Sequence, residues 1–253
     1  MKRTDWYLST IDPQAQITAR EYGLGLEIAD FCIPGTLDDG FPEADRAVLE
    51  KLRGIPKRVL HGPFNELFPC AVDPKARALA RERFKQAVDL AARYNASKVV
   101  LHGGFNPWLY YPCWYKEQSV LFWKAFLPEI PAGVTVCLEN VLEKTPDMLL
   151  EIVTGVDSEK IALCLDVGHV NAYSPVPVPE WIDRYGAQLC HLHIHNNDGS
   201  ADTHSPLRAG SLDIPAIVSR ARAVSPGASF TLELPQAAES VRWLAEQLTI
   251  DNG

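Results

Sequence analysis

Residues 161–169 read IALCLDVGH, and this stretch decides the fold. Five mostly apolar residues predict a buried strand that ends in Asp166, and His169 follows three residues later. A carboxylate at the mouth of an apolar strand loses favourable solvation unless a positive group compensates. A divalent cation bound by Asp166 and His169 would provide that compensation. From this stretch alone, a solvated strand end in which His169 caps the next segment is an equally good interpretation.

The same arrangement recurs along the chain, because short β-rich runs alternate with longer helical patterns. Strands are predicted at 5–9, 23–28, 58–61, 98–102, 134–139, 161–166, 189–195 and 229–234. Helices are predicted at 13–22, 43–53, 74–94, 116–126, 146–153, 179–185, 214–224 and 237–248. The clearest helix, 74–94, has an apolar stripe formed by Ala78, Leu79, Phe84, Ala87, Val88 and Ala91.

Eight strands separated by helices predict an α/β protein with the fold of a closed (β/α)8 TIM barrel. The length of 253 residues suits such a barrel, which typically needs roughly 250. No linker is long enough to divide the chain, so residues 1–253 are expected to form a single barrel domain.

Composition limits the classes of partner. The formal net charge is −8, and Lys and Arg form no cluster, which argues against a partner held mainly through phosphates. A nucleic acid is therefore an unfavoured partner, though net charge alone does not exclude one. No apolar run approaches the ~20 residues of a membrane span, and the N-terminus lacks the apolar region of a secretory signal. We expect a cytoplasmic protein with no membrane partner.

The six cysteines include no CxxC pair, so a disulfide framework is not expected. Cys137 lies two residues before Glu139, and Cys164 two residues before Asp166. Because side chains two apart along a strand share a face, these thiols are expected to fill the barrel beneath the two carboxylates.

Polar side chains follow apolar runs at six predicted strand ends. They are His61, His102, Glu139, Asp166 with His169, His193 and Glu233. In a (β/α)8 barrel these ends converge on one face, where catalytic residues lie. Imidazoles and carboxylates without paired cysteines suit Zn, Mn, Co or Fe better than Ca. On the seventh strand His191, His193 and His195 share a face, and the sequence leaves open which is the ligand.

Two loops are unusual. Residues 105–115 (FNPWLYYPCWY) hold six aromatic residues and two prolines, which indicates a lid over the barrel mouth, an oligomer contact or a small satellite core. Residues 196–210 (NNDGSADTHSPLRAG) are polar and rich in candidate ligands, so this loop is expected to bring side chains over a site.

Taken together, seven motifs resemble the xylose-isomerase-like TIM barrels, the superfamily of endonuclease IV and the sugar epimerases. The motifs are HGPF (61–64), LHGG (101–104), LEN (138–140), DVGH (166–169), HIHNNDG (193–199), DTH (202–204) and LELP (232–235). They span nearly the whole chain in the order of the superfamily.

Similarity to the epimerase branch implies a divalent-metal-dependent isomerase or epimerase of a small-molecule sugar or sugar phosphate. The metal, Zn or Mn, would be held by Glu139, Asp166, His193 and Glu233. The metal would polarise a carbonyl, and Glu139 and Glu233 would move a proton at the adjacent carbon. His169 would bond a sugar hydroxyl, and the further substrate-binding candidates are His195, Trp108 and Asn140.

Similarity to the endonuclease IV branch implies a metal-dependent phosphoester hydrolase of the abasic-site endonuclease type. Five more positions then join the ligands in a trinuclear zinc cluster, namely His61, His102, His169, Asp202 and His204. Several neighbouring metals suit phosphate displacement. The acidic balance, the HIHNNDG motif and the lack of basic or wedge-bearing loops depart from an enzyme that kinks a DNA duplex. The sequence leaves the oligomeric state open.

Overall fold

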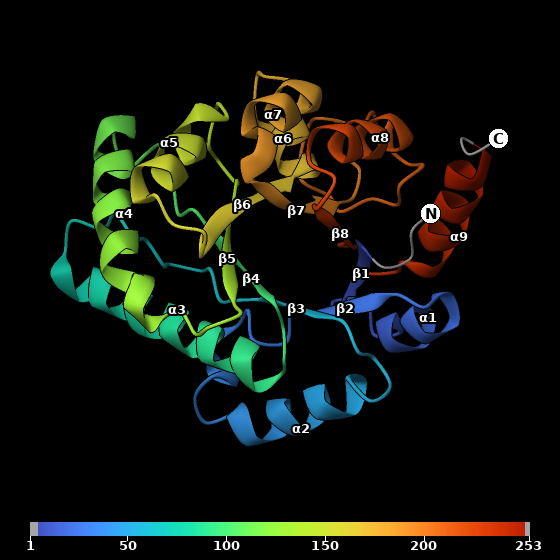
Figure 1. Ribbon diagram of the computed structural model, residues 1–253, viewed down its shortest axis with the longest axis horizontal. Coiled ribbons are helices and arrows are strands. Elements are labelled where there is room, and N and C mark those ends of the chain that lie inside the picture. Colours follow the sequence, from blue (N-terminus) through green and yellow to red (C-terminus); the bar gives the residue numbers. More distant parts are fainter. Residues whose placement is uncertain (1–4, 251–253) are drawn as a thin grey trace.

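The eight strands of the chain are parallel and close into a barrel in sequence order, with β8 pairing with β1 (Figure 1). This computed structural model describes residues 5–250. The strands are β1 (Trp6–Ser9), β2 (Gly25–Ile28), β3 (Arg58–His61), β4 (Lys98–His102), β5 (Thr135–Glu139), β6 (Ile161–Asp166), β7 (Leu189–Ile194) and β8 (Ser229–Leu232). The predicted (β/α)8 barrel is confirmed.

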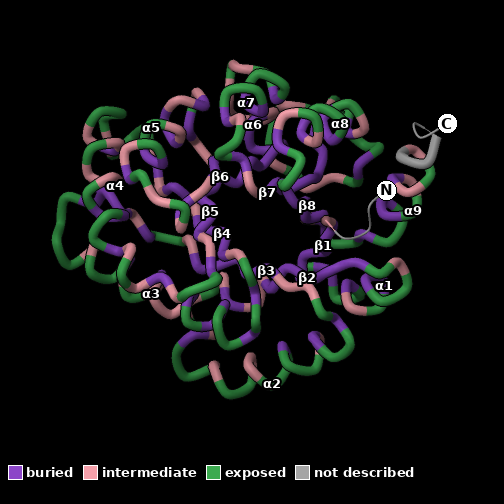
Figure 2. Tube along the Cα trace, in the orientation of Figure 1, coloured by how far each residue is buried: buried purple, intermediate pink, exposed green. Residues whose placement is uncertain are grey.

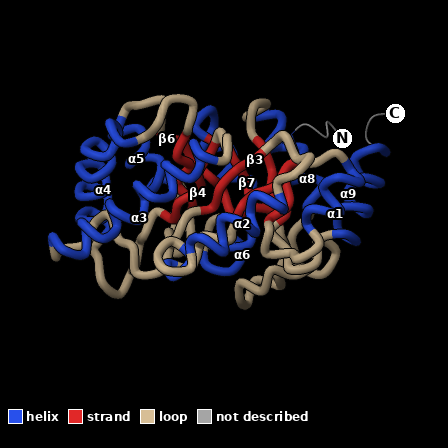
Figure 3. The backbone as a smooth tube through the Cα atoms, turned by 90° about the horizontal axis from the view of Figure 1, so that it is seen from below, coloured by secondary structure: helices blue, strands red, loops and turns tan. Residues whose placement is uncertain are grey.

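The helices surround the strands, so the strands are enclosed on their outer side (Figure 3). They are α1 (Ala15–Tyr22), α2 (Phe41–Lys51), α3 (Pro74–Arg93), α4 (Pro112–Phe126), α5 (Asp147–Val156), α6 (Val167–Tyr173), α7 (Val178–Tyr185), α8 (Ile214–Val224) and α9 (Ala238–Ile250). Short 3-10 turns are η2 (Pro34–Thr36), η3 (Leu127–Glu129) and η4 (Gly186–Gln188). No helix in the described part of the chain is long and apolar enough to cross a membrane.

The apolar core has two layers. The larger one lies between the strands and the helices, and Figure 2 shows the strands as buried and the outer sides of the helices as exposed. The smaller one fills the barrel itself and contains Tyr7, Val59, Val100, Cys137 and Cys164. The two thiols therefore pack inside the barrel, as the strand alternation predicts. All six cysteines are free.

Helix α3 buries a face that differs in part from the predicted stripe. Phe84, Ala87, Val88 and Ala91 are buried as expected, but Leu79 is 43% exposed and Ala78 is exposed as well. At about 100° per residue, positions 78 and 79 lie more than a quarter turn from the face centred on positions 84 and 88, and Ala80 takes the inward position instead.

Two helix boundaries near the barrel mouth differ from the sequence prediction. Helix α6 was not predicted, and it begins directly after β6 because the Asp166 carboxylate accepts a hydrogen bond of 2.7 Å from the backbone N–H of His169. Helix α4 begins at Pro112, four residues before the predicted start, so the aromatic stretch 105–115 is only partly a loop.

Candidate metal centre

A cavity of about 440 Å³ lies at the carboxyl ends of the strands. Its wall includes most of the ligand candidates predicted from the sequence, namely His61, His102, Glu139, His169, Asp202, His204 and Glu233. The remaining two, Asp166 and His193, are fully buried and contact this wall from within the barrel. The fold therefore brings all nine candidates together.

The central group is arranged around one nitrogen of His193. Its Nδ1 atom lies 3.1 Å from Glu139 Oε1, 3.2 Å from Glu233 Oε2 and 3.8 Å from Asp166 Oδ2. The three carboxylates come from the ends of β5 and β6 and from the residue after β8. One imidazole and three carboxylates in this arrangement can hold one divalent cation.

Two further groups flank the central one. The Nε2 atoms of His61 and His102 lie 3.3 Å and 3.5 Å from Glu139 Oε2. On the other side, the Nε2 atoms of His169 and His204 lie 3.3 Å and 3.0 Å from Asp202 Oδ2. Glu139 thus belongs to both the central group and the first flanking group.

Three of these imidazoles are oriented from behind by backbone carbonyls. The Nδ1 atom of His61 lies 2.9 Å from the carbonyl oxygen of Gly62, that of His169 lies 2.9 Å from the carbonyl of Asn140, and that of His204 lies 2.9 Å from the carbonyl of Glu233. Because a carbonyl oxygen only accepts, each Nδ1 carries the hydrogen. Each Nε2 therefore faces the site, and a hydrogen bond on the far nitrogen is how proteins commonly orient an imidazole that binds a metal.

Two acceptor atoms in the site lack a donor. Glu139 Oε2 and Asp202 Oδ1 are buried, and neither receives a hydrogen bond from the described residues. A buried carboxylate oxygen without a donor is costly unless positive charge lies close to it. The donor set of imidazoles and carboxylates thus fits a cation such as zinc or manganese.

The pKa values of two imidazoles also indicate a site that favours positive charge. Burial lowers the pKa of His169, but the carboxylates of Asp166, Asp202 and Glu139 outweigh it and raise this pKa well above its usual range. Burial also lowers the pKa of His204, but the carboxylates of Asp202, Glu233 and Asp166 together outweigh it and raise this pKa to about 9. The carboxylates of this cluster therefore stabilise positive charge. Protons on the imidazoles can supply that charge, and a bound cation can replace those protons.

The central carboxylates are ionised at neutral pH. Burial raises the pKa of Glu139, but His193 and His102 outweigh it and hold this pKa well below its usual range. Burial likewise raises the pKa of Glu233, and His193 outweighs it, so the pKa is lowered. For Asp166, His169 and His195 overcome the effect of burial and lower the pKa to about 2. These groups are ready to bind a cation or to accept a proton.

The three histidines of β7 have different surroundings. His193 faces the carboxylate group described above, whereas His195 Nε2 lies 3.0 and 3.1 Å from the two carboxylate oxygens of Asp166. The ring of His195 also stacks on His204 at a centroid distance of 3.9 Å. Gly168 is required here, because a Cβ atom at this position would lie 1.9 Å from His195 Cε1.

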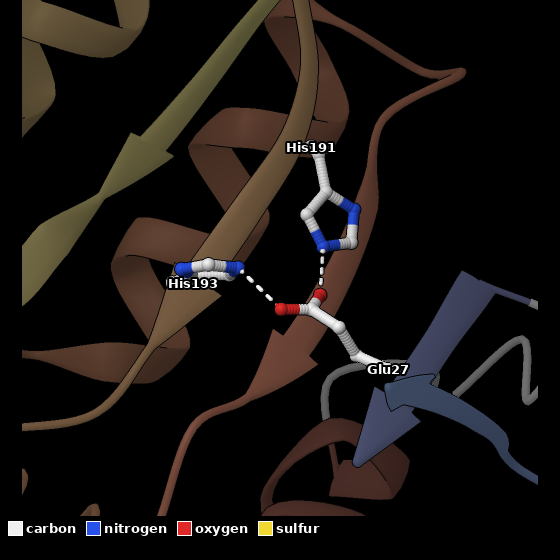
Figure 4. A group of neighbouring side chains, drawn as sticks. All are labelled: Glu27, His191 and His193. Atoms are coloured by element: carbon white, nitrogen blue, oxygen red, sulfur yellow. Dashed lines mark hydrogen bonds and ion pairs between the residues drawn. The ribbon is translucent and has the colours of Figure 1, made fainter. Parts of the chain in front are cut away.

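His191 lies deeper in the barrel and contacts Glu27 of β2 rather than the cavity (Figure 4). Burial lowers the pKa of His191 to about 4, with Glu27 opposing this shift, so the ring is neutral at pH 7. Of the three histidines, His193 is the one whose nitrogen faces all three central carboxylates, whereas His195 contacts Asp166 alone among them.

Comparison with known proteins places this geometry in a family. The family model for the xylose isomerase-like TIM barrel matches residues 24–247, which is most of the chain. The chain belongs to the xylose isomerase-like TIM barrel family. The resemblance predicted from the seven motifs is thus confirmed.

Among curated relatives of this family, an uncharacterised protein of Methanocaldococcus jannaschii is 29% identical over 211 residues, covering 77% of this chain and 71% of the relative. Among solved structures, a D-tagatose 3-epimerase-like protein superposes with a TM-score of 0.82, at 23% identity and 98% coverage of each chain. The IolI protein with a bound zinc atom superposes with a TM-score of 0.74, at 17% identity, covering 98% of this chain and 97% of its own. At these identities the two structures share the fold with this xylose isomerase-like barrel.

None of the three additional substrate-binding candidates lies on the cavity wall. His195 is fully buried against Asp166, and Asn140 is buried with its side chain bonded to the backbone N–H (2.9 Å) and carbonyl (3.1 Å) of Asp166. Trp108 is 81% exposed. The geometry therefore gives His195 and Asn140 a part in holding Asp166 and leaves Trp108 outside the cavity.

Several wall residues of this xylose isomerase-like barrel were missed by the sequence analysis. They are Phe64, Asn65, Glu66, Asn106 and Tyr173. Phe64 stacks on His102 with ring centroids 4.3 Å apart, and its place in the HGPF motif was the available signal. The others lie in the segments after β3 and β4 and in α6, whose paths do not follow from the sequence pattern.

The aromatic stretch divides into a packed part and an exposed part. Phe105 and Tyr115 are buried, and Trp114 is partly buried with its indole N–H bonded to the carbonyl of Cys70 at 2.8 Å. Trp108 and Tyr111 are exposed. A packed satellite core and two exposed aromatic side chains therefore coexist in one segment, and whether the exposed pair forms a lid or a contact surface stays a prediction.

A pair of alanine variants separates these roles. Trp108→Ala is expected to leave the melting temperature unchanged, because the exposed indole packs on little else, and to raise KM severalfold if the indole closes over the cavity as a lid. Trp114→Ala is expected to lower the melting temperature through lost packing and a lost hydrogen bond. Steady-state kinetics and sedimentation velocity on both variants provide the measurement. An unchanged KM together with an altered sedimentation coefficient for Trp108→Ala would instead indicate an interface.

Proposed function

We propose that this chain is a divalent-cation-dependent sugar isomerase or epimerase. The observation that carries the proposal is the pair Glu139 and Glu233. Both carboxylates line one cavity, both approach the same nitrogen of His193, and both have lowered pKa values. Two ionised carboxylates beside a shared cation site suit proton transfer at a carbon next to a carbonyl.

Glu139, Asp166, His193 and Glu233 would hold the cation, for which zinc or manganese fits the donor set. When bound, the cation would supply Lewis acidity that polarises a substrate carbonyl and its neighbouring hydroxyl. This polarisation makes the hydrogen on the adjacent carbon more acidic, which is the condition for a carboxylate to remove it.

The protein groups would carry the proton. In an epimerase, one of Glu139 and Glu233 accepts the proton from one face of the substrate carbon, and the other returns a proton to the opposite face. In an isomerase, one carboxylate moves the proton between neighbouring carbons. His169, whose Nε2 reaches the cavity wall beside Asp202, is placed to bond a substrate hydroxyl.

The cavity wall favours an uncharged sugar over a sugar phosphate. Among the described residues that line it there is no lysine or arginine, whereas Glu66, Glu139, Asp202 and Glu233 bring negative charge. Lys144 lies near Tyr173 but donates its Nζ to the carbonyl of that residue at 2.7 Å. A phosphate would thus find no lysine or arginine side chain, the cations that usually bind it, among the described residues of the wall.

A phosphoester hydrolase is the second candidate, and the two flanking groups favour it. His61 and His102 approach one oxygen of Glu139, and His169 and His204 approach one oxygen of Asp202, so three neighbouring cations could be held. Multinuclear sites suit phosphate displacement. The lack of basic side chains on the cavity wall weighs against a nucleic-acid substrate.

The test is a substrate screen of zinc-loaded and manganese-loaded protein against ketoses, the matching ketose phosphates and an oligonucleotide with an abasic site. We expect turnover of an uncharged ketose in D2O to place deuterium on the carbon next to the carbonyl. We expect its kcat/KM to exceed that of the phosphate by at least about tenfold, or ~1.4 kcal/mol in the transition state. Cleavage of the oligonucleotide without turnover of any ketose would contradict the proposal and support the hydrolase.

A further inference from the structure

Beneath the central group lies a buried polar cluster that the proposed chemistry does not use. Glu27 of β2 reaches across the barrel to His191 and His193 of β7 (Figure 4). Its Oε1 lies 2.9 Å from His193 Nε2, and its Oε2 lies 3.0 Å from His191 Nε2. All three side chains are fully buried. A fully buried carboxylate inside a barrel is costly, so it calls for an explanation.

The pairing of Glu27 with His193 is exclusive. Among the described residues, neither Glu27 Oε1 nor His193 Nε2 is hydrogen-bonded to any other group, and the two atoms lie 2.9 Å apart as an ion pair. The opposite nitrogen of the same ring, Nδ1, faces Glu139, Asp166 and Glu233. The two sides of one imidazole are thus divided between Glu27 and the ligand group.

A series of hydrogen bonds from Lys98 to Glu27 determines which groups donate a hydrogen to the Glu27 carboxylate. Lys98 donates from Nζ to Ser229 Oγ at 2.6 Å, so the Ser229 hydroxyl is free to donate to His191 Nδ1, also at 2.6 Å. With Nδ1 accepting from Ser229, the hydrogen of His191 lies on Nε2, which faces the Glu27 Oε2 acceptor at 3.0 Å.

Thr231 is the last residue of this hydrogen-bonded series. Its hydroxyl donates to Glu27 Oε2 at 2.6 Å, and its oxygen lies 2.9 Å from His191 Nε2. Oε2 is therefore engaged by two donors, and Oε1 is left for His193. Lys98 at one end of this series can only donate a hydrogen bond, and the Glu27 carboxylate at the other end can only accept one. The donor and acceptor of each contact between them follow from these two ends.

We propose that Glu27 is a positioning residue of the cation centre, which keeps the hydrogen of His193 on Nε2 and thereby presents Nδ1 to the cation. The inference rests on the cation centre proposed above. It also accounts for the buried charge, since a carboxylate behind a ligating imidazole orients the ring and raises its basicity. A second cation held by Glu27, His191 and His193 is the competing arrangement, and Thr231 makes it unnecessary because hydrogen bonds already engage Oε2 and His191 Nε2.

The test replaces the carboxylate with an amide in the full chain. Glu27→Gln is expected to weaken zinc binding about 10- to 100-fold, because an amide N–H facing Nε2 favours the hydrogen on Nδ1, where it opposes the cation. The Kd for zinc is measured on cation-free protein by competition with a chromophoric chelator. In parallel, ¹⁵N-labelled histidine gives the NMR signals of the imidazole N–H groups, and zinc-loaded wild type should show His193 with hydrogen on Nε2.

Glu143→Gln is the matched control. Glu143 is also a buried carboxylate, but it accepts hydrogen bonds from the Tyr115 hydroxyl (2.7 Å) and the Val141 N–H (2.8 Å) instead of pairing with His193. Its zinc Kd is expected within about threefold of wild type. Thr231→Val keeps the Glu27 carboxylate and removes one donor to it, and should weaken zinc binding about three- to tenfold. This variant tests the same proposal if Glu27→Gln does not fold.

The outcomes separate the inference from the proposed function. A wild-type chain that binds no zinc, manganese, cobalt or iron would overturn both. If wild type binds zinc and Glu139→Gln weakens that binding, but Glu27→Gln changes neither the Kd nor the His193 signal, the positioning role is wrong while the centre stands. If Glu27→Gln loses one whole equivalent of zinc and the rest binds with unchanged Kd, Glu27 is itself a ligand of a second cation.

Discussion

Replacing Glu139 with glutamine is expected to lower kcat by about 10³- to 10⁴-fold, with the fold retained. Glu139 would act both as a ligand and as a proton carrier, and the amide cannot accept a proton at neutral pH. The substitution is nearly isosteric, so the apolar core around β5 stays packed. Turnover of the ketose identified in the substrate screen gives kcat, and circular dichroism reports on the fold.

Glu233→Gln is expected to cause a loss of the same size, and the two variants together distinguish the roles of the carboxylates. In an epimerase, each variant retains one base, so one should still exchange the substrate hydrogen with D2O while forming no epimer. Glu143→Gln should keep turnover within about threefold of wild type, because its carboxylate bonds Tyr115 and Val141. More than about a tenth of wild-type kcat in cation-loaded Glu139→Gln or Glu233→Gln would refute the assignment.

The strand ends were predictable because two simple physical rules apply to them. Parallel strands of a closed barrel are buried on both sides, so they appear as apolar runs, and their carboxyl ends meet at one face. A polar residue directly after such a run, as at Asp166 or Glu139, is therefore easily recognised. These rules bring together the six strand-end candidates, with His169 just beyond β6, before any coordinates are known, whereas Asp202 and His204 lie in the loop after β7 and were expected as ligands only from the family resemblance.

Glu27 was missed because these rules concern strand ends. It lies within β2, in the run GLGLEI, where a single carboxylate could equally have faced solvent. Its partners come from β7 and β8, which are 164 and 204 residues away along the chain. Only the closed barrel brings them together, so the isolated glutamate in an apolar strand was the one available signal.

The substrate side of the site was the least predictable part. Asn140 and His195 belong to conspicuous motifs, yet the fold uses both to hold Asp166. Trp108 stands out by residue type but is exposed away from the cavity wall. The direction in which a loop side chain points depends on its local backbone path, and composition does not encode that path.

Removing the bound cations with a chelator is expected to reduce turnover about a thousandfold, since Lewis-acid polarisation is worth several kcal/mol in such reactions. The cation-free chain should also melt at a lower temperature, because a ligand at ~1,000 times its Kd stabilises the folded state by about 4 kcal/mol. Elemental analysis of protein as purified, followed by calorimetry before and after chelation, gives both quantities. Full turnover by the cation-free chain would contradict the cation-dependent mechanism.

The number of cations that restores turnover then decides between the two candidate functions. A sugar isomerase needs only the central group around His193, so one equivalent of zinc or manganese should restore most of the activity. Asp202→Asn, which weakens the flanking group of His169 and His204, should then keep ketose turnover within about tenfold of wild type. A hydrolase would need up to three equivalents and would lose its activity in Asp202→Asn, because phosphate displacement depends on cations that stabilise both the attacking and the leaving oxygen.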